Sequence, residues 1–351
     1  MPETMLAVRY YEPGKLRAEQ VEIPQPGPGE LIVHSSVALT CGTDVKMYRR
    51  GHPLAKPPQI MGHEFAGTVS AVGSGVNGFE VGMKVVAANS APCNRCFYCL
   101  IHQPNLCEHL DENIVGFTWP GTYAEYVRIP ERIVRQNTFR IMDGVPLAEV
   151  ASLEPLACVV HGWDLVRSFQ TGGTTVVIGG GPIGLLHSQL ARLNGAKRVV
   201  LCDVVDERLR EADRVGVDVT FNSATENPSS KIMDLTGRGA DIVVEAVGRK
   251  ETWELAPKLA RKGGTVLLFG GCAPGTETMF EAEKIHYGEL HIQGSFHHTP
   301  AAVERAFKLI VAGKVSIKPL ISHEMELERA EEALQLMGSG KALKIALYPP
   351  K

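Results

Sequence analysis

The pattern of apolar and polar positions changes character near residue 154. Before this point, short apolar or alternating runs are separated by glycine and proline, as is typical of buried and half-buried strands. Residues 25–30, QPGPGE, have the composition of a turn or loop. The predicted strands of this part are residues 31–39, 67–73 and 84–88. No long helical period occurs before about Leu147, so the pattern predicts an irregular all-β barrel or sandwich.

Strands and helices alternate after Glu154. The predicted strands are residues 174–180, 197–203, 219–221, 240–248, 263–271 and 290–296. The predicted helices are residues 183–193, 207–215 and 253–259, followed by 301–312 and 327–337 and a last strand, 342–348. Six strands with helices between them are typical of a doubly wound parallel sheet. The fold class expected for the whole chain is therefore α/β, with an all-β part at its start.

Length and composition are those of an ordinary globular protein with two domains. The chain has 351 residues, of which 44% are hydrophobic and 21% are charged. The net charge of −3, with acids and bases interleaved, gives no basic stripe for nucleic acid. The apolar runs are too short to span a membrane, and the N-terminus lacks a secretion signal. We therefore expect a cytoplasmic protein with no nucleic-acid or membrane partner.

Four of the eight cysteines lie within fifteen residues of one another. Their spacing, C-x2-C-x2-C-x7-C, comprises Cys93, Cys96, Cys99 and Cys107. Four thiolates favour a tetrahedral zinc ion with no open position, which is a structural site. An iron–sulfur cluster also uses four thiolates, but this spacing differs from the ferredoxin runs. A closed site cannot bind substrate, so any catalytic metal must lie elsewhere.

A glycine motif follows the strand at 174–178. Residues 179–184, GGGPIG, fit G-x-G-x-x-G and open the helix at 183–193. In a dinucleotide-binding turn, Gly179 makes the bend, Gly181 admits the pyrophosphate and Gly184 lets helix and strand pack. Asp203 ends the next strand, where a carboxylate accepts hydrogen bonds from the adenosine ribose and repels a 2′-phosphate. The motif and Asp203 together predict a site for NAD rather than NADP.

A second, open metal site is a weaker prediction from spacing alone. Cys41 and His63 combine with a carboxylate, from Glu64 or from Glu154, to give three protein ligands and one free position. A single cysteine and a single histidine are more often packing residues, so this alternative stays open. The free position would take water or substrate.

Several motifs in the same order resemble one family. They are CGTD (41–44), GHEFAGTVSAVGSGV (62–76), the cysteine quartet, GTYAEY (121–126), EPLACVVHG (154–162) and GGGPIG (179–184). The chain resembles the zinc-dependent medium-chain dehydrogenases/reductases, in particular the polyol (sorbitol/iditol-like) and threonine dehydrogenase branch. The resemblance implies a GroES-like β-barrel catalytic domain at 1–154, a Rossmann NAD-binding domain at 155–295 and a C-terminal return to the catalytic domain at 296–351.

The resemblance also implies residue roles. Cys41 and His63 correspond to catalytic zinc ligands, with Glu154 or Glu64 as the third, directly or through water. Asp44 would orient the imidazole of His63. Thr43 would receive the substrate hydroxyl proton. The cofactor-binding residues implied in this way are Gly179, Gly181, Pro182, Ile183, Gly184, Asp203 and Arg208.

Several positions near the expected site depart from the family pattern. Lys46 stands where a histidine commonly ends the proton relay, so we expect the relay to run instead to bulk water. His297-His298 stand where polyol relatives carry Arg-Tyr, and Asn89 lies where threonine dehydrogenases carry a histidine. A gathering of basic residues near the substrate would favour an anionic or phosphorylated polyol. The residues concerned are Lys46, Arg49, Arg50, His297 and His298. The alternative is that Lys46 and the two arginines form a solvated charged face.

The expected function is NAD-dependent oxidation of a secondary alcohol, a polyol or sugar alcohol, to a ketone. The alternatives are L-threonine 3-dehydrogenase and, in another class, a catalytically silent NAD-binding protein with the structural zinc alone. A zinc-ribbon nucleic-acid binder is disfavoured by the acidic charge balance. Relatives imply a homodimer or homotetramer.

Overall fold

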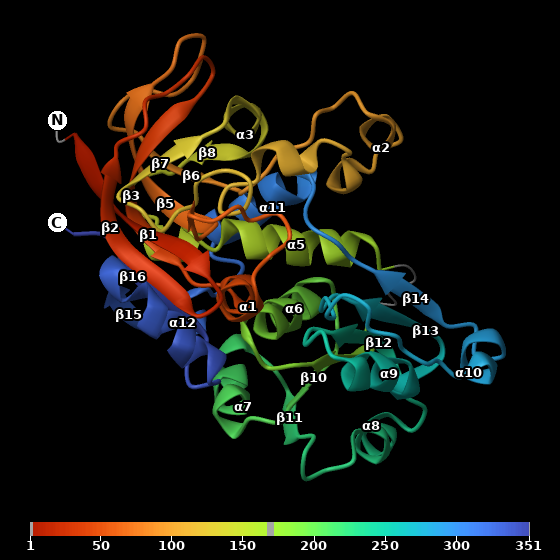
Figure 1. Ribbon diagram of the computed structural model, residues 1–351. Coiled ribbons are helices and arrows are strands. Elements are labelled where there is room, and N and C mark those ends of the chain that lie inside the picture. Colours follow the sequence, from red (N-terminus) through yellow and green to blue (C-terminus); the bar gives the residue numbers. More distant parts are fainter. Residues whose placement is uncertain (1–2, 167–171, 351) are drawn as a thin grey trace. The chain divides into compact units, whose positions relative to one another are not determined.

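The computed structural model describes residues 3–166 and 172–350, which form two compact units (Figure 1). The first unit comprises Met1–Ala157 with His298–Lys351, and the second comprises Cys158–His297. Within the described ranges, every helix is too short or too polar to cross a membrane.

Two β-sheets dominate the first unit. A three-stranded sheet has the order β2-β1-β4, and a seven-stranded sheet has the order β15-β16-β3-β5-β6-β8, with β7 also paired with β3. The strands are β1 (Thr4–Glu12), β2 (Lys15–Glu22), β3 (Leu31–Leu39), β4 (Gln59–Ile60), β5 (Glu64–Val72), β6 (Lys84–Ala87), β7 (Tyr126–Ile129), β8 (Thr138–Arg140), β15 (Ile321–Glu326) and β16 (Lys344–Tyr348). The strands predicted at 31–39, 67–73 and 84–88 are β3, β5 and β6.

The C-terminal segment belongs to this same sheet. Strand β16 runs antiparallel to β3, with Ala346 opposite Leu39 and Leu347 opposite Ala38. Residues more than 300 positions apart in the sequence are therefore direct neighbours (Figure 1). This pairing brings side chains from both ends of the chain to the edge where β3 ends and β5 begins.

Short helices connect these strands, and among them the sequence analysis predicted only α11 and α12. The helices are α1 (Gly42–Arg50), α2 (Phe97–Leu100), α3 (Glu131–Asn137), α4 (Leu147–Val150), α11 (Pro300–Val311) and α12 (Ala330–Gly338), and α5 (Leu153–Asp164) begins in this unit. Helix α1 is nine residues long and buries Val45, Met47 and Tyr48 while Lys46 stays exposed. So few apolar positions are not enough to establish a helical period in the sequence.

The second unit is a six-stranded parallel sheet with helices, as predicted. The strand order is β11-β10-β9-β12-β13-β14, and each of these neighbouring pairs is parallel. The strands are β9 (Thr174–Ile178), β10 (Arg198–Asp203), β11 (Val219–Asn222), β12 (Ala240–Glu245), β13 (Ala260–Leu268) and β14 (His291–Gly294). The helices are α6 (Pro182–Leu193), α7 (Asp206–Ala212), α8 (Pro228–Thr236), α9 (Lys250–Leu259) and α10 (Ala282–His286), of which the sequence analysis missed α8 and α10.

The order of these strands reverses beside β9. The chain runs outward from β9 to β10 and β11 and then returns to β12 on the other side of β9. Ligands of such sheets bind at this reversal, beyond the carboxyl ends of the strands. The glycine motif, which follows β9, therefore lies where a dinucleotide is expected.

A buried histidine of helix α6 provides a test of the packing of the second unit. His187 is fully buried against the rings of Phe269 and Trp163, and neither ring nitrogen has a hydrogen-bond partner among the described residues. Burial lowers the pKa of His187 from 6.5 to about 3. The unfolded chain therefore binds a proton below about pH 6.5 that the folded chain does not, and stability falls with decreasing pH from there towards pH 3.

We expect His187→Leu to remove this part of the pH dependence. Between pH 6 and pH 4, the free energy of unfolding of the original chain should fall relative to the variant by up to about 1.4 kcal/mol per pH unit. Urea denaturation of both proteins at several pH values measures the difference. Parallel pH profiles would show that His187 is protonated in the folded state or reaches solvent.

Candidate active site

The four cysteines of the quartet come together in the first unit. Their Sγ atoms all lie within 4.8 Å of one another. The separations are 3.5 Å for Cys96–Cys99, 3.8 Å for Cys96–Cys107 and 3.9 Å for Cys93–Cys99. A tetrahedron with Zn–S bonds of about 2.3 Å has S···S edges of about 3.8 Å. The spacing of these thiols therefore fits one zinc ion with four sulfur ligands.

Backbone N–H groups surround the same sulfurs. The N–H groups of Arg95 and Cys96 donate to Cys93 Sγ at 3.5 and 3.3 Å, and those of Cys93 and His109 donate to Cys107 Sγ at 3.2 and 3.4 Å. Despite desolvation by burial, hydrogen bonds lower the pKa of Cys93 and that of Cys96, the latter to about 6, whereas burial raises the pKa of Cys99 and that of Cys107, the latter to about 12. Such donors stabilise thiolates, the form of cysteine that binds zinc.

Replacing one of these ligands should destabilise the first unit. We expect Cys93→Ala to lose one zinc ion per chain and to melt at a lower temperature, because zinc binding contributes directly to folding of such loops. Metal analysis and thermal melting measure the two effects. Cys272→Ala, a cysteine outside the quartet, is the control and should keep its full zinc content. A Cys93→Ala protein with unchanged zinc and melting temperature would contradict a structural zinc.

A second group of possible ligands consists of Cys41, His63 and Glu64. Their ligand atoms also lie within 4.8 Å of one another. Cys41 follows β3, and His63 and Glu64 lie at the start of β5. Because Leu39 pairs with Glu64 across these antiparallel strands, the end of β3 lies beside the start of β5. His63 and Glu64 are buried, and Cys41 is half-buried. One soft sulfur, one imidazole and one carboxylate form a donor set suited to zinc with an open fourth position.

Asp44 holds the histidine of this group, as the sequence analysis expected. Its Oδ1 lies 3.2 Å from Nδ1 of His63, while its Oδ2 accepts hydrogen bonds from the backbone N–H of Cys41 at 2.9 Å and the hydroxyl of Tyr123 at 2.8 Å. Burial alone would lower the pKa of His63, but Asp44 and Cys41 raise it well above its usual value. With Nδ1 held by Asp44, Nε2 remains the nitrogen for a metal.

Lys344 is the residue of this site that the sequence analysis missed. Its side chain is buried, and Nζ donates to both carboxylate oxygens of Glu64, at 2.6 Å to Oε1, and to the carbonyl of Thr40 at 3.1 Å. Burial raises the pKa of Glu64 to about 7, against the opposing effect of Lys344. Lys344 begins β16, and only the pairing of β16 with β3 brings it here. A charged residue within the apolar run ALKIALY was the one available signal.

The other carboxylate, Glu154, lies in the first turn of α5. It is buried and acts electrostatically on both Glu64 and Lys344, raising the pKa of each. Among the described residues, its carboxylate lies within 4.8 Å of a ring nitrogen of His298, in a ligand group separate from that of Cys41. Thr43, at the start of α1, is half-buried. Glu64 and Glu154 are therefore two buried carboxylates of the first unit that influence each other electrostatically.

The basic residues of α1 do not gather around these carboxylates. Lys46, Arg49 and Arg50 are exposed, and Arg49 donates to the carbonyl of Gly338 at 2.7 Å. This arrangement matches the solvated charged face that the sequence analysis kept as the alternative to an anion-binding cluster.

The glycine turn of the second unit has the geometry of a dinucleotide-binding motif. Gly179 has φ +106°, a conformation that favours glycine, and a Cβ on Gly184 would lie 1.7 Å from the carbonyl oxygen of Gly179. A Cβ on Gly181 would instead meet no atom within 4 Å. Gly181 immediately precedes α6, whose first residues are Pro182 and Ile183. The open space lies at a helix N-terminus, which suits a pyrophosphate.

Asp203 connects this turn to the end of β10. Its Oδ2 accepts a hydrogen bond from the N–H of Gly180 at 2.7 Å, and its Oδ1 accepts one from Val205 at 2.9 Å. Arg208 of α7 lies 3.5 Å from Oδ2. Asp203 therefore shapes the glycine turn as well as standing where a ribose is expected. The sequence analysis did not foresee this second role.

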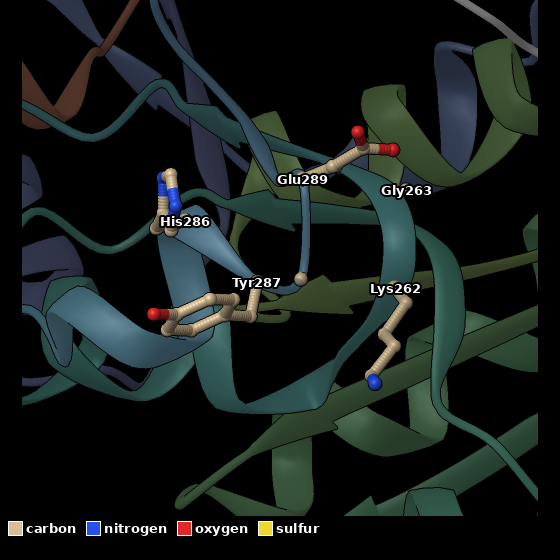
Figure 2. A pocket seen from close by; sticks show the side chains of 6 residues that line it. Lys262, Gly263, His286, Tyr287 and Glu289 are labelled. Atoms are coloured by element: carbon tan, nitrogen blue, oxygen red, sulfur yellow. The ribbon is translucent and has the colours of Figure 1, made fainter.

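A hollow of about 530 Å³ elsewhere on the second unit contains none of these residues. Its lining includes Lys262, Tyr287 and Glu289, which Figure 2 shows around the opening. It lies at the amino ends of β13 and β14, whereas the glycine turn lies beyond the carboxyl end of β9. The hollow and the glycine turn therefore lie at opposite ends of the parallel strands.

Comparison with known proteins agrees with these features. Residues 27–138 match the family model described as the alcohol dehydrogenase GroES-like domain, and residues 182–312 match the one described as zinc-binding dehydrogenase. The L-threonine 3-dehydrogenase of Symbiobacterium thermophilum is 34% identical over 358 residues, which cover 99% of both chains. The sorbitol dehydrogenase of Halalkalibacterium halodurans is 34% identical over 334 residues, or 93% of this chain and 94% of the relative.

Solved structures include a close match to the fold. A chain from Sinorhizobium meliloti 1021, described as a zinc-binding dehydrogenase and bound to NADP, has a TM-score of 0.91 and 32% identity, covering 99% of this chain and 100% of the other. The protein therefore belongs to the zinc-dependent medium-chain dehydrogenase family. It is an oxidoreductase of the alcohol dehydrogenase class that uses zinc and a nicotinamide cofactor, as the sequence analysis predicted.

Proposed function

We propose that this enzyme oxidises a secondary hydroxyl group of a polyol or sugar alcohol to a ketone, with NAD as the hydride acceptor. The observation that carries the proposal is the buried group of Cys41, His63 and Glu64, with the second carboxylate of Glu154 beside it. A zinc ion held there would act as a Lewis acid on the substrate oxygen. Relatives named D-arabinitol dehydrogenase 1 and sorbitol dehydrogenase support a sugar alcohol as the substrate.

In the first unit, some residues are proposed to bind the zinc ion and others to transfer the proton. Cys41 and His63 are the proposed zinc ligands, with Glu64 or Glu154 as the third, directly or through water. Asp44 fixes the orientation of His63, and Lys344 fixes that of Glu64. Thr43, half-buried at the start of α1, is the proposed acceptor of the hydroxyl proton. Lys46 is exposed at the next turn of this helix, so the proton can pass from there to bulk water.

The second unit supplies the proposed cofactor site. The backbone of Gly179, Gly181, Pro182, Ile183 and Gly184 would bind the pyrophosphate, and Asp203 with Arg208 would bind the adenosine ribose. The space at Gly181 and the helix N-terminus behind it support this role. The carboxylate of Asp203 supports NAD over NADP, because it repels a 2′-phosphate.

We expect Asp203→Ala to relax this cofactor preference. The variant should lose most of the difference between its kcat/KM values for NAD and NADP, since the repelling carboxylate is gone. It should also bind both cofactors more weakly, because the N–H of Gly180 loses its acceptor. Steady-state kinetics with both cofactors measure these ratios. An unchanged ratio would mean that another group selects the ribose.

L-Threonine is the second candidate substrate, because several relatives of more than 30% identity are named L-threonine 3-dehydrogenase. Threonine carries a charged amino and carboxylate pair, which a polyol lacks. A screen of sugar alcohols, 2,3-diols and L-threonine, followed by NADH absorbance, separates the two. The proposal predicts kcat/KM at least tenfold higher for a sugar alcohol. A clear preference for threonine would overturn it, and no turnover with any alcohol would favour a catalytically silent NAD-binding protein.

We further infer the organisation of the whole protein. The first unit is the proposed catalytic domain and the second the proposed cofactor domain. The eight cysteines are all free thiols, which supports a reducing compartment such as the cytoplasm.

A homodimer or homotetramer is supported by β14, an edge strand of the parallel sheet, which edge-to-edge pairing could cover. Light scattering of the purified protein gives the oligomeric mass.

A further inference from the structure

Asn89, Glu154 and His298 are buried polar residues that lie close together in the first unit. Their side chains are only 5%, 8% and 3% exposed. Nε2 of His298 lies 3.2 Å from Oδ1 of Asn89, and a ring nitrogen of His298 lies within 4.8 Å of a carboxylate oxygen of Glu154. The three residues come from distant segments: the loop after β6, the first turn of α5 and the approach to α11.

Two of these residues are departures from the family pattern that the sequence analysis noted separately. Asn89 and His298 are 209 positions apart, yet they contact each other directly. The two departures are therefore one structural feature. It lies beside a carboxylate already placed among the proposed zinc ligands.

The chemistry of the three groups suits a chain that fixes a carboxylate. The side-chain amide of Asn89 has two possible orientations, which differ by a rotation of 180°. In the first, its oxygen accepts a hydrogen bond from Nε2–H of His298. In the second, its NH2 group donates to Nε2, and the hydrogen of the neutral imidazole then lies on Nδ1. Nδ1–H is then a donor on a ring that has a nitrogen within 4.8 Å of a carboxylate oxygen of Glu154. Buried polar groups joined in this way have few alternative partners, so each restricts the orientation of the next.

A carboxylate that serves a metal depends on such partners. Groups that hydrogen-bond to metal ligands set their orientation, and their loss typically weakens metal binding by about 10–100-fold. Asp44 has this role for His63, and Lys344 has it for Glu64. Glu154 is the remaining residue proposed for the metal site, and a ring nitrogen of His298 lies within 4.8 Å of its carboxylate.

We propose that His298, held by Asn89, is the positioning residue for Glu154 at the catalytic zinc site. The pair fixes the direction from which the carboxylate approaches the metal. This inference rests on the proposed function, because it takes Glu154 to serve the zinc ion bound by Cys41 and His63. It adds Asn89 and His298 to the residues on which the metal site depends.

The test uses Co²⁺ and Zn²⁺ with the full-length protein. Visible absorption of the Co²⁺-substituted protein reports ligand geometry, and competition with a chelator measures Zn²⁺ affinity at the catalytic site. We compare His298→Leu, which removes the donor, with His298→Gln, whose amide can still donate to a carboxylate. Glu154→Gln is the reference variant. His187→Leu is the matched control, since it removes a buried histidine from the second unit.

His298→Leu should weaken catalytic Zn²⁺ binding by about 10–100-fold and shift the Co²⁺ spectrum in the same direction as Glu154→Gln. His298→Gln should recover part of both, and His187→Leu should match the original protein. A folded His298→Leu or His298→Gln protein with the original affinity and spectrum, while Glu154→Gln differs, would overturn the inference. Should His298→Leu fail to fold, His298→Gln alone decides.

Failure of the proposed function gives a different result. If Glu154→Gln leaves the spectrum unchanged while Cys41→Ala abolishes it, Glu154 does not serve the metal and the inference is wrong, but the zinc site stands. If Cys41→Ala also leaves the spectrum unchanged, the proposed catalytic site itself is wrong.

Discussion

Cys41→Ala and His63→Ala should each reduce turnover by about 10³-fold or more while leaving NAD binding nearly intact. Both residues belong to the buried ligand group of the first unit. Loss of the metal removes several kcal/mol of charge stabilisation from the reaction, and each 1.36 kcal/mol corresponds to a factor of ten in rate. The glycine turn and Asp203 lie in the second unit and retain their own contacts. NADH formation and NAD titration by fluorescence measure the two effects.

The control for this prediction is His323→Ala, an exposed histidine of β15 in the same unit. It should turn over substrate at the original rate. Cys41→Ala or His63→Ala with more than a tenth of the original kcat would mean that these residues only pack the site. Loss of NAD binding along with turnover would point instead to general unfolding.

Lys344→Met should lower the free energy of unfolding by about 3–5 kcal/mol. Its ammonium group is the hydrogen-bond donor to both oxygens of Glu64, and both side chains are buried. Removing one partner of a buried ion pair leaves the other charge without compensation, which costs far more than the pair itself contributes. Chemical denaturation followed by fluorescence measures the change.

Two variants distinguish this explanation from a simple loss of packing. Lys344→Met combined with Glu64→Gln should recover most of the lost stability, because no buried charge is left unpaired. Lys84→Met is the matched control: Lys84 belongs to the same sheet but pairs at 3.3 Å with the exposed Asp143, so we expect a change below about 1 kcal/mol. If the double variant is as unstable as Lys344→Met alone, the buried charge is not the cause.

The sequence predicted the parallel sheet of the second unit well, because its signals are local. Apolar runs such as TTVVI and RVVLCD are β9 and β10, and the glycine motif lies between β9 and α6 as expected. Short elements gave weaker signals. Helix α1 was missed because nine residues with three buried apolar side chains show no helical period. Strands β1 and β2 were missed as well, since they alternate irregularly.

The candidate site was predictable only as far as its residues lie in motifs. The cysteine quartet, Cys41 with Asp44, and His63 with Glu64 are each close in sequence. Lys344 and His298 are not: Lys344 lies 280 positions from Glu64, and His298 lies 209 positions from Asn89. The apolar run ALKIALY around Lys344 is a weak local signal of burial, and it does not reveal which carboxylate the lysine contacts. Such pairs are set by the return of the C-terminal segment to the first unit.

We propose that the first unit binds two zinc ions, one closed by four thiolates and one open to substrate. Metal analysis of the purified protein and of Cys41→Ala distinguishes the two sites. We expect two zinc ions per chain in the original protein and one in the variant, with the melting temperature little changed. One zinc ion in both would contradict it, because only the cysteine quartet would then hold metal.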